Sequence, residues 1–205
     1  MQKIKIGATS FLDYIMSTPR GCTKIVKAQR SMYNDPESQA FHGYESIKSG
    51  MKRAISSTDA EAELAAVIAK ATKQMAPHYE AIATGFIAWR GRSKGTGVRA
   101  RDAAWASGNL TVTLRHIIGL RQPDGSELAV LTYVKEPVLT QDSADLLLRI
   151  MDLEMGNILP GATSTVLDAR RGKPFRLRRN ANKPDLDAAL AAEAAKYVTH
   201  WTAVA

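Results

Sequence analysis

Two strand patterns joined by a turn constrain the fold of this chain more than any other feature of its sequence. Leu110–Leu114 alternates apolar and polar residues with a period of two, and the run continues to Leu120, which is typical of a strand. Gln122-Pro123-Asp124-Gly125 then predicts a turn, because Pro presets φ and Gly accepts a positive φ. Leu128–Val134 is apolar on both faces, so we expect it to be a central strand of a sheet.

Helical patterns stand on both sides of this strand pair. Thr58 and Glu61 predict a capping box at the start of a helix over 58–75, since each side chain can satisfy the other residue's free backbone N–H. The segment 140–155 predicts a second helix that is apolar almost all round, and such a helix is buried. A last helix is predicted over 182–201.

Further strands are predicted at Ala81–Trp89 and at Thr163–Leu167, and a turn leads from the second of these into Phe175-Arg176-Leu177. The first 57 residues read as short helices with breaks. The sequence therefore predicts an α+β fold with a mixed sheet of about four to five strands flanked by helices. Residues 1–57 are predicted to form a helical N-terminal appendage, and residues 58–205 the α+β core domain.

The composition narrows the class of protein. Hydrophobic residues make up 45% of the 205 residues and charged residues 23%, which excludes a disordered chain, a collagen-like fibre and a disulfide scaffold. The single cysteine, Cys22, excludes an intramolecular disulfide and favours a reducing, cytoplasmic location. The first residues lack the features of a signal peptide. No stretch approaches the length of apolar sequence that spans a membrane, so no membrane partner is expected.

The net charge of +8 is concentrated in two runs without any acidic residue. Residues 90–101 hold five basic side chains and three glycines, and residues 170–183 hold seven basic side chains. Arg offers phosphate a bidentate fork, so we expect DNA or RNA to bind here if both runs lie on one face. Trp89 and Trp105 flank the first run and could stack on bases. The predicted nucleic-acid-binding residues are Arg90, Arg92, Lys94, Arg99, Arg101, Arg170, Arg171, Lys173, Arg176, Arg178 and Arg179.

The predicted order of helix, three strands, helix and strand over residues 58–170 resembles the core of the PD-(D/E)XK nuclease superfamily. That resemblance implies a Mg²⁺ site, with an acid on the second strand and an acid-x-Lys motif on the third. Lys135 matches the motif lysine, but Tyr133 stands where an acid is expected, and Leu110–Ile118 contains no acid. The resemblance therefore implies a nuclease-like scaffold whose active-site motif is degenerate.

An alternative is a metal-dependent nuclease with a relocated site. The weak catalytic candidates for it are Lys135, Asp168, Asp124 and Glu61 or Glu63, and Mg²⁺ would be required only in this case. We expect Asp168 to pair with the neighbouring arginines instead. His42, His78, His116 and His200 show no metal-ligand spacing, and we expect no metal site among them. Placed near the middle of a predicted strand, His116 could carry a proton.

A second alternative is a non-enzymatic assembly or adaptor module, including a homo-oligomer, that docks through its apolar C-terminal helix and its short N-terminal helices. The segments LTYVKEPVLTQDSADLLLRIM and VLDARRGKPFRL also resemble blocks of an uncharacterised bacterial family. This second resemblance implies no function.

Overall fold

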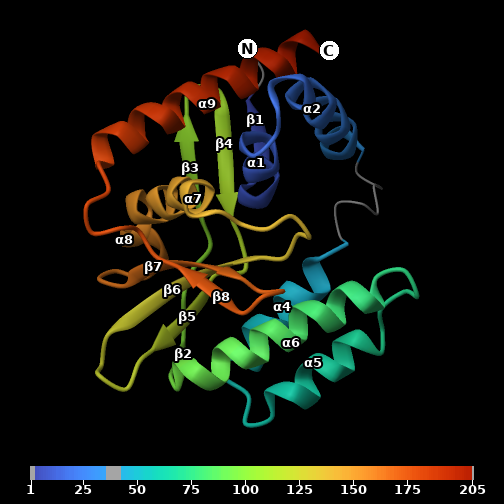
Figure 1. Ribbon diagram of the computed structural model, residues 1–205, viewed down its shortest axis with the longest axis vertical. Coiled ribbons are helices and arrows are strands. Elements are labelled where there is room, and N and C mark those ends of the chain that lie inside the picture. The colour runs from blue at the N-terminus through green and yellow to red at the C-terminus, as the bar shows by residue number, and fades with distance from the viewer. Residues whose placement is uncertain (1–2, 36–42, 205) are drawn as a thin grey trace.

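The computed structural model describes residues 3–35 and 43–204, which form two mixed sheets with helices packed around them (Figure 1). The α+β class is therefore confirmed. The strands are β1 (Ile4–Gly7), β2 (Thr96–Val98), β3 (Ala103–Ser107), β4 (Leu110–Leu114), β5 (Ile118–Arg121), β6 (Glu127–Tyr133), β7 (Thr163–Asp168) and β8 (Lys173–Phe175). The helices are α1 (Ala8–Ile15), α2 (Pro19–Asn34), α4 (Glu45–Ala54), α5 (Ala60–Ile68), α6 (Ala76–Ser93), α7 (Gln141–Leu153), α8 (Met155–Ile158) and α9 (Lys183–Ala203). His42 lies outside the described residues, and no described helix has both the length and the apolar character needed to cross a membrane.

The larger sheet has the strand order β2-β5-β6-β7-β8. β2, β5 and β6 are antiparallel neighbours, β7 is parallel to β6, and β8 is antiparallel to β7. The predicted turn at 122–125 joins β5 to β6, so this hairpin is confirmed. The central position predicted for Leu128–Val134 is also confirmed, because β6 pairs on both sides.

Alternate residues of β6 explain why its sequence is apolar on both faces. Leu128 and Val130 face a core shared with α4, α5 and α6, whereas Leu131 and Tyr133 face a core shared with α1, α7 and α9. Figure 1 shows α4, α5 and α6 below this sheet and α7 above it. A strand buried on both faces carries apolar side chains at successive positions rather than at alternate ones.

The smaller sheet has the order β1-β4-β3, with β1 parallel to β4 and β3 antiparallel to it. The prediction that the first 57 residues are purely helical is wrong at Ile4–Gly7, which form the strand β1. Their side chains Ile4 and Ile6 are buried in the same core as Trp201 of α9. A division of the chain at residue 57 remains a prediction, although these contacts join segments from both sides of it.

The prediction of a strand at Ala81–Trp89 is wrong, because this segment lies inside the helix α6. Pro77 lies in the first turn of the helix, where the missing N–H of proline is harmless. Ile82, Phe86 and Trp89 are buried at helical spacing against the lower face of the larger sheet. The apolar run is therefore one face of a helix and not a strand.

Several boundaries differ from those predicted by the sequence. The prediction of a capping box at Thr58 and Glu61 is wrong, since Asp59 is the N-cap of α5 and accepts a hydrogen bond from the Ala62 amide at 2.9 Å. The strand predicted from Leu110 to Leu120 is broken between β4 and β5, where His116 has a φ of 57°. The last strand, β8, ends at Phe175, so Arg176 and Arg178 lie beyond it and share no strand face.

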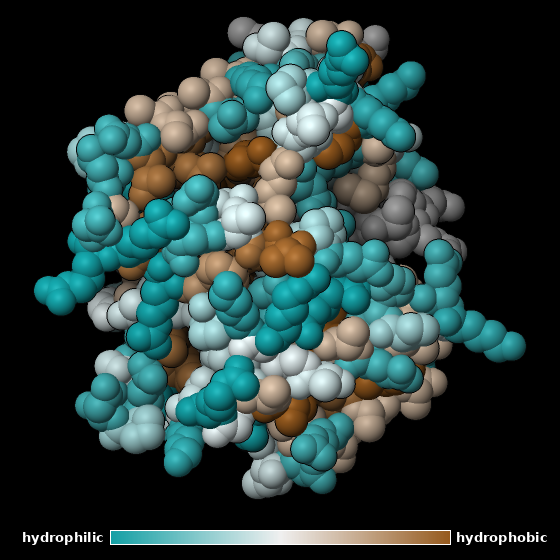
Figure 2. Space-filling model, viewed as in Figure 1, coloured by the Kyte–Doolittle hydropathy of each residue, from teal (hydrophilic) through white to brown (hydrophobic). Residues whose placement is uncertain are grey.

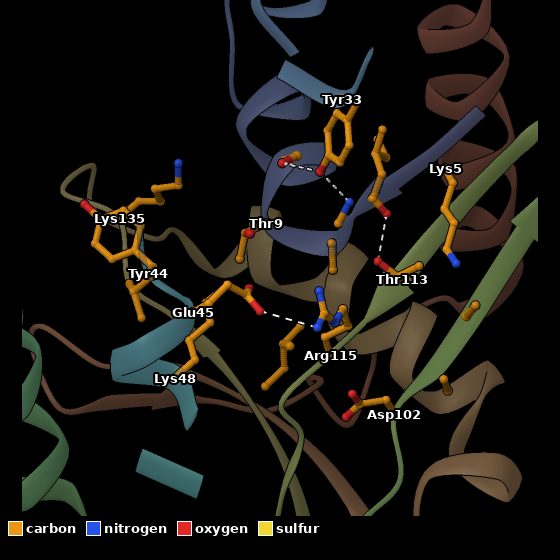
Figure 3. A pocket seen from close by; sticks show the side chains of 18 of the residues that line it. Lys5, Thr9, Tyr33, Tyr44, Glu45, Lys48, Asp102, Thr113, Arg115 and Lys135 are labelled. Atoms are coloured by element: carbon orange, nitrogen blue, oxygen red, sulfur yellow. Dashed lines mark hydrogen bonds and ion pairs between the residues drawn. The ribbon is translucent and has the colours of Figure 1, made fainter. Parts of the chain in front are cut away.

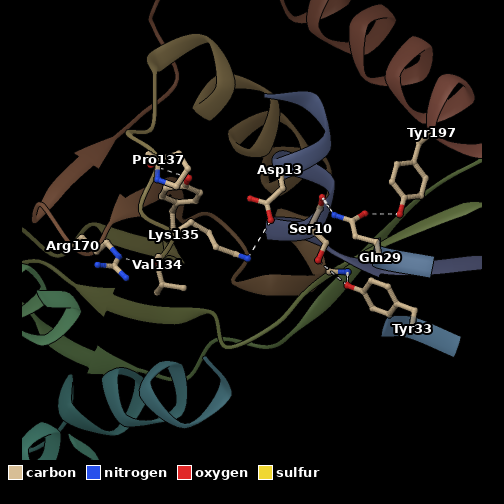
Figure 4. Close-up of polar contacts among 11 residues, drawn as sticks. Ser10, Asp13, Gln29, Tyr33, Val134, Lys135, Pro137, Arg170 and Tyr197 are labelled. Carbon is tan, nitrogen blue, oxygen red and sulfur yellow. Dashed lines mark hydrogen bonds and ion pairs between the residues drawn. The ribbon is translucent and has the colours of Figure 1, made fainter. Parts of the chain in front are cut away.

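Three tyrosine side chains are almost fully enclosed by the core that β6 shares with α1, α7 and α9, which we call the upper core. Tyr14, Tyr133 and Tyr197 are each at most 1% exposed, and their hydroxyls hydrogen-bond to His200, to the Pro137 carbonyl and to Gln29. Figure 4 shows the contact between Tyr197 and Gln29. Burial raises the pKa of Tyr133 to about 12 and raises the pKa values of the other two as well. The neutral phenols are therefore part of the folded state.

We expect the stability of the protein to fall steeply as the pH rises from about 10 to about 12. In this window an unfolded chain releases its tyrosine protons, near pH 10, while the folded chain still holds them, so rising pH favours unfolding. Tyrosinate absorbance and circular dichroism measured along one pH titration test this. The two signals should change together; ionisation of all tyrosines with unchanged circular dichroism would contradict it.

Candidate functional site

The predicted basic residues divide into two groups according to what their side chains contact. Five of them bind other parts of the protein. Arg90 donates to the Ser57 carbonyl at 2.9 Å, and Arg170 donates to the Val134 carbonyl at 2.9 Å. These guanidinium groups hold segments of the fold together. The other three in this group are Arg92, Arg171 and Arg178, which bind Gly172, Asp168 and Asp142.

The two basic runs meet at one point of the surface. Arg92 at the end of α6 donates to the carbonyl oxygen of Gly172 at 2.6 Å, in the turn between β7 and β8. This contact depends on Gly85, because a Cβ built there would lie 2.1 Å from the Ala169 carbonyl oxygen. Figure 2 shows hydrophilic side chains over this junction of α6 and β8. The start of the first run and the start of the second are therefore neighbours.

Six predicted basic residues are exposed, and their side chains make no ion pair with a carboxylate in the described part of the chain. Three of them, Lys173, Arg176 and Arg179, follow the β8 edge of the larger sheet and the segment after it. Lys94 follows α6, near β2 at the other edge of this sheet. The remaining two, Arg99 and Arg101, lie between β2 and β3. These six cations are free to bind an anion.

The two tryptophans that flank the first basic run differ in exposure. Trp89 is only 3% exposed and packs on Phe86 at 5.6 Å between ring centroids. Trp105 is half-buried and packs against the upper core beside Phe11. The prediction of base stacking is wrong for Trp89, because its ring fills the space between α6 and the sheet.

The candidates for a relocated nuclease site lie on separate elements. Glu61 and Glu63 lie on the first turn of α5, and Asp124 lies in the β5–β6 turn. Asp168 is fully buried at the end of β7 and pairs with Arg171 Nη1 at 3.0 Å, which confirms the expected ion pair. Among residues 3–35 and 43–204 no three His, Cys, Asp or Glu side chains gather closely enough to hold a metal ion. We derive no step through Mg²⁺, and the nuclease alternative stays a prediction.

Lys135 lines a cleft that the sequence did not reveal. The cleft has a volume of about 790 Å³ and lies where β1, α1 and α4 meet the ends of β4 and β6 (Figure 3). Its charged lining residues are Lys5, Glu45, Lys48, Asp102, Arg115 and Lys135. Tyr33, Tyr44, Met32 and Leu131 add aromatic and apolar surface. A cleft of this size and mixed lining is typical of small-molecule sites.

One side of the cleft is held by a partly buried ion pair. Lys135 Nζ lies 3.2 Å from Asp13 Oδ2 on α1 and 5.7 Å from the centre of the Tyr44 ring (Figure 4). Burial raises the pKa of Asp13, although the charge of Lys135 opposes this effect. The pair fixes the lysine at the mouth of the cleft.

A second contact orients the first residue of α4. Glu45 Oε2 accepts a hydrogen bond from His116 Nε2 at 2.7 Å and lies 3.5 Å from Arg115 Nη2 (Figure 3). Burial alone would raise the pKa of Glu45, but the hydrogen bond and the charges of His116 and Arg115 together lower it. The carboxylate is thus ionised and already occupied. The backbone conformation of His116, which the sequence placed within a strand, turns the ring toward α4.

Lys48 and Lys5 are the charged side chains of the cleft that make no hydrogen bond or ion pair with a described residue, and Lys48 is the more enclosed of the two. Lys48 lies one turn after Glu45 on α4. Burial lowers the pKa of Lys48; the charges of Lys135 and Arg115 lower it further, and those of Glu45 and Asp13 oppose the shift. A buried ammonium group without a partner is unfavourable. Lys48 therefore presents an ammonium group to the cleft without a carboxylate partner among the described residues.

The first turn of α1 also lines the cleft. Gly7, Ala8, Thr9 and Ser10 are lining residues, and no side chain caps this helix. The Gly7 amide donates instead to the Tyr33 hydroxyl at 2.8 Å (Figure 4). The positive end of the helix dipole therefore adds to the field of the four cationic side chains.

Comparison of the chain with protein-family models and with curated proteins gave no match.

Proposed function

We propose that this protein binds nucleic acid through a basic surface at the junction of α6 and β8, on a nuclease-like scaffold. The contact between Arg92 and Gly172 carries this proposal, because it places the start of the first acid-free run against the second run. The unpaired cations of the first run, Lys94, Arg99 and Arg101, lie near β2 at the opposite edge of the larger sheet and are not part of this surface. Lys173, Arg176 and Arg179 extend the same surface along the β8 edge without carboxylate partners in the described chain. Unpaired exposed cations are what a phosphodiester backbone recruits, with release of its counterions.

The order of elements supports the scaffold. α6, the three antiparallel strands β2, β5 and β6, the helix α7 and the parallel strand β7 follow one another, with β3 and β4 inserted between β2 and β5. This is the order helix, three strands, helix and strand. It supports a resemblance to the nuclease core and carries no catalytic claim. We also propose a cytoplasmic location, since the one cysteine, Cys22, is a free, buried thiol.

Fluorescence anisotropy with duplex and single-stranded DNA and RNA tests the binding. We expect the affinity to fall steeply between about 50 and 200 mM salt, and each lost phosphate contact to lower the slope of log affinity against log salt by about 0.9. The triple variant Lys173→Glu/Arg176→Glu/Arg179→Glu should bind more weakly with a smaller slope.

The matched control carries the same charge change elsewhere, at the exposed residues Lys24, Lys27 and Lys70. If this control weakens binding as much as the triple variant, net charge and not the β8 edge is responsible. Binding that is weak at low salt and insensitive to salt would overturn the proposal.

A further inference from the structure

The cleft beside α1 has features that the basic surface does not explain. It lies at the meeting point of the smaller sheet with α4, and none of its described lining residues belongs to β8 (Figure 3). Four cationic side chains line it against two acidic ones, namely Lys5, Lys48, Arg115 and Lys135 against Glu45 and Asp102. Of the two acids, Glu45 is bound by His116, and Asp102 lies 3.7 Å from Lys52. The positive charge of the cleft is therefore not balanced by its own lining.

We infer that this cleft binds a small molecule through a phosphate group, which would lie between Lys48, Arg115 and the first turn of α1. Lys48 carries the inference. Its side chain lines the cleft and is largely enclosed, and no described carboxylate lies within ion-pair distance of it. A folded chain that keeps a charged lysine in such a place gives up stability, and an anionic ligand recovers it.

The arrangement of the donors favours phosphate over carboxylate. Lys48 comes from α4, Arg115 follows β4, and the uncapped amides belong to α1, so they approach from different elements (Figure 3). A tetrahedral anion with about two negative charges accepts from several directions at once, whereas a planar carboxylate carries one charge. Helix N-termini also commonly hold phosphate.

The rest of the cleft has room for an organic group. Its volume of about 790 Å³ is much larger than a phosphate ion needs, and ligand pockets range from about 300 to 1,000 Å³. Tyr44 and Tyr33 lie on its wall, and Met32 and Leu131 add apolar surface. The expected ligand class is therefore a phosphate monoester with an apolar or planar part, such as an aryl phosphate.

Phenyl phosphate serves as the probe, with inorganic phosphate and benzoate as comparisons, and isothermal titration calorimetry measures binding to the full chain. We expect phenyl phosphate to bind more tightly than inorganic phosphate, and both more tightly than benzoate. Lys48→Met should weaken phenyl phosphate by at least about tenfold, which corresponds to one charge-assisted contact. Lys27→Met, an exposed lysine on α2 outside the cleft, should bind as the unchanged protein does.

Thermal unfolding without ligand separates a binding role of Lys48 from a structural one. If Lys48 serves a ligand, its unpaired charge destabilises the ligand-free protein, and Lys48→Met should raise the melting temperature. If Lys48 instead stabilises Glu45 or Asp13, Lys48→Met should lower the melting temperature. Equal affinity of Lys48→Met and the unchanged protein for phenyl phosphate, or a lower melting temperature of the variant, would overturn the inference. So would tighter binding of benzoate.

This inference does not depend on the proposed nucleic-acid surface, and the two fail separately. The triple variant at Lys173, Arg176 and Arg179 should keep its affinity for phenyl phosphate. Lys48→Met should keep its affinity for DNA and RNA. If Lys48→Met loses nucleic-acid binding and phenyl phosphate binding together, the cleft is part of the nucleic-acid site, and the inference of a separate small-molecule site is wrong.

Discussion

Replacing Gly85 by alanine is expected to destabilise the protein by about 3 kcal/mol, and replacing it by valine to prevent folding. Gly85 lies in the middle of α6, where an added Cβ would lie 2.1 Å from the Ala169 carbonyl oxygen and 2.6 Å from atoms of the Arg170 backbone. Backbone atoms of the turn between β7 and β8 cannot move aside as the end of a flexible side chain can. Overpacking of a core costs about 1–3 kcal/mol, and a collision with backbone belongs at the upper end.

Gly91 provides the matched control on the same helix. A Cβ at this position meets nothing within 4 Å, and alanine favours a helix over glycine by about 1 kcal/mol. Gly91→Ala should therefore raise the free energy of unfolding, whereas Gly85→Ala should lower it. Urea unfolding followed by circular dichroism measures both. Equal stabilities of the two variants would show that α6 does not pack on the β7–β8 turn as described.

This contact also shows where sequence patterns fail. The segment Ala81–Trp89 is a short apolar run, and such a run is compatible with a buried strand or with a buried helix. The continuous apolar run predicts a strand, whereas the spacing of Ile82, Phe86 and Trp89 fits a helix equally well. The burial of these residues against the sheet decides the matter, and that contact is made with strands far along the chain.

The hairpin of β5 and β6 could be predicted because its signals are local. A turn residue with positive φ, Gly125, stands between two apolar runs. β1 could not be predicted in the same way, since it has only four residues and pairs with β4 more than 100 residues later. Its strand character arises from that pairing and not from its own pattern.

The cleft could not be predicted from the sequence either, because its residues come together only through contacts between distant segments. Lys135 was singled out as a motif lysine, yet its neighbours in space come from α1 and α4, far away in sequence. Lys48 lies between the buried residues Ile47 and Met51 on an amphipathic helix, where a lysine looks like any solvent-facing residue. Only the fold shows that its face of the helix meets β4 and β6.

In the basic run after β7, the arginines that stabilise the fold differ from those that are exposed to bind nucleic acid. Arg171→Met tests this difference. We expect this change to destabilise the protein by about 2 kcal/mol, because the fully buried Asp168 carboxylate loses its partner. The Arg171 side chain is 36% exposed, so solvent weakens the pair. Asp168 is 0% exposed, and Arg171 Nη1 lies 3.0 Å from its Oδ2 while Nη2 donates to the Glu136 carbonyl at 2.7 Å. Chemical denaturation monitored by circular dichroism measures the loss.

Arg176→Met is the matched control, since Arg176 is exposed and its side chain makes no ion pair with a described residue. Its effect on stability should stay within about 0.5 kcal/mol, while its effect on nucleic-acid affinity should be the larger of the two variants. Asp168→Asn combined with Arg171→Met should cost less than the sum of the single changes, because the buried charge is gone. An additive result would mean that Arg171 stabilises the fold through the Glu136 carbonyl alone. An arginine run whose members divide in this way is part scaffold and part surface, so only the unpaired members are available to a phosphate backbone.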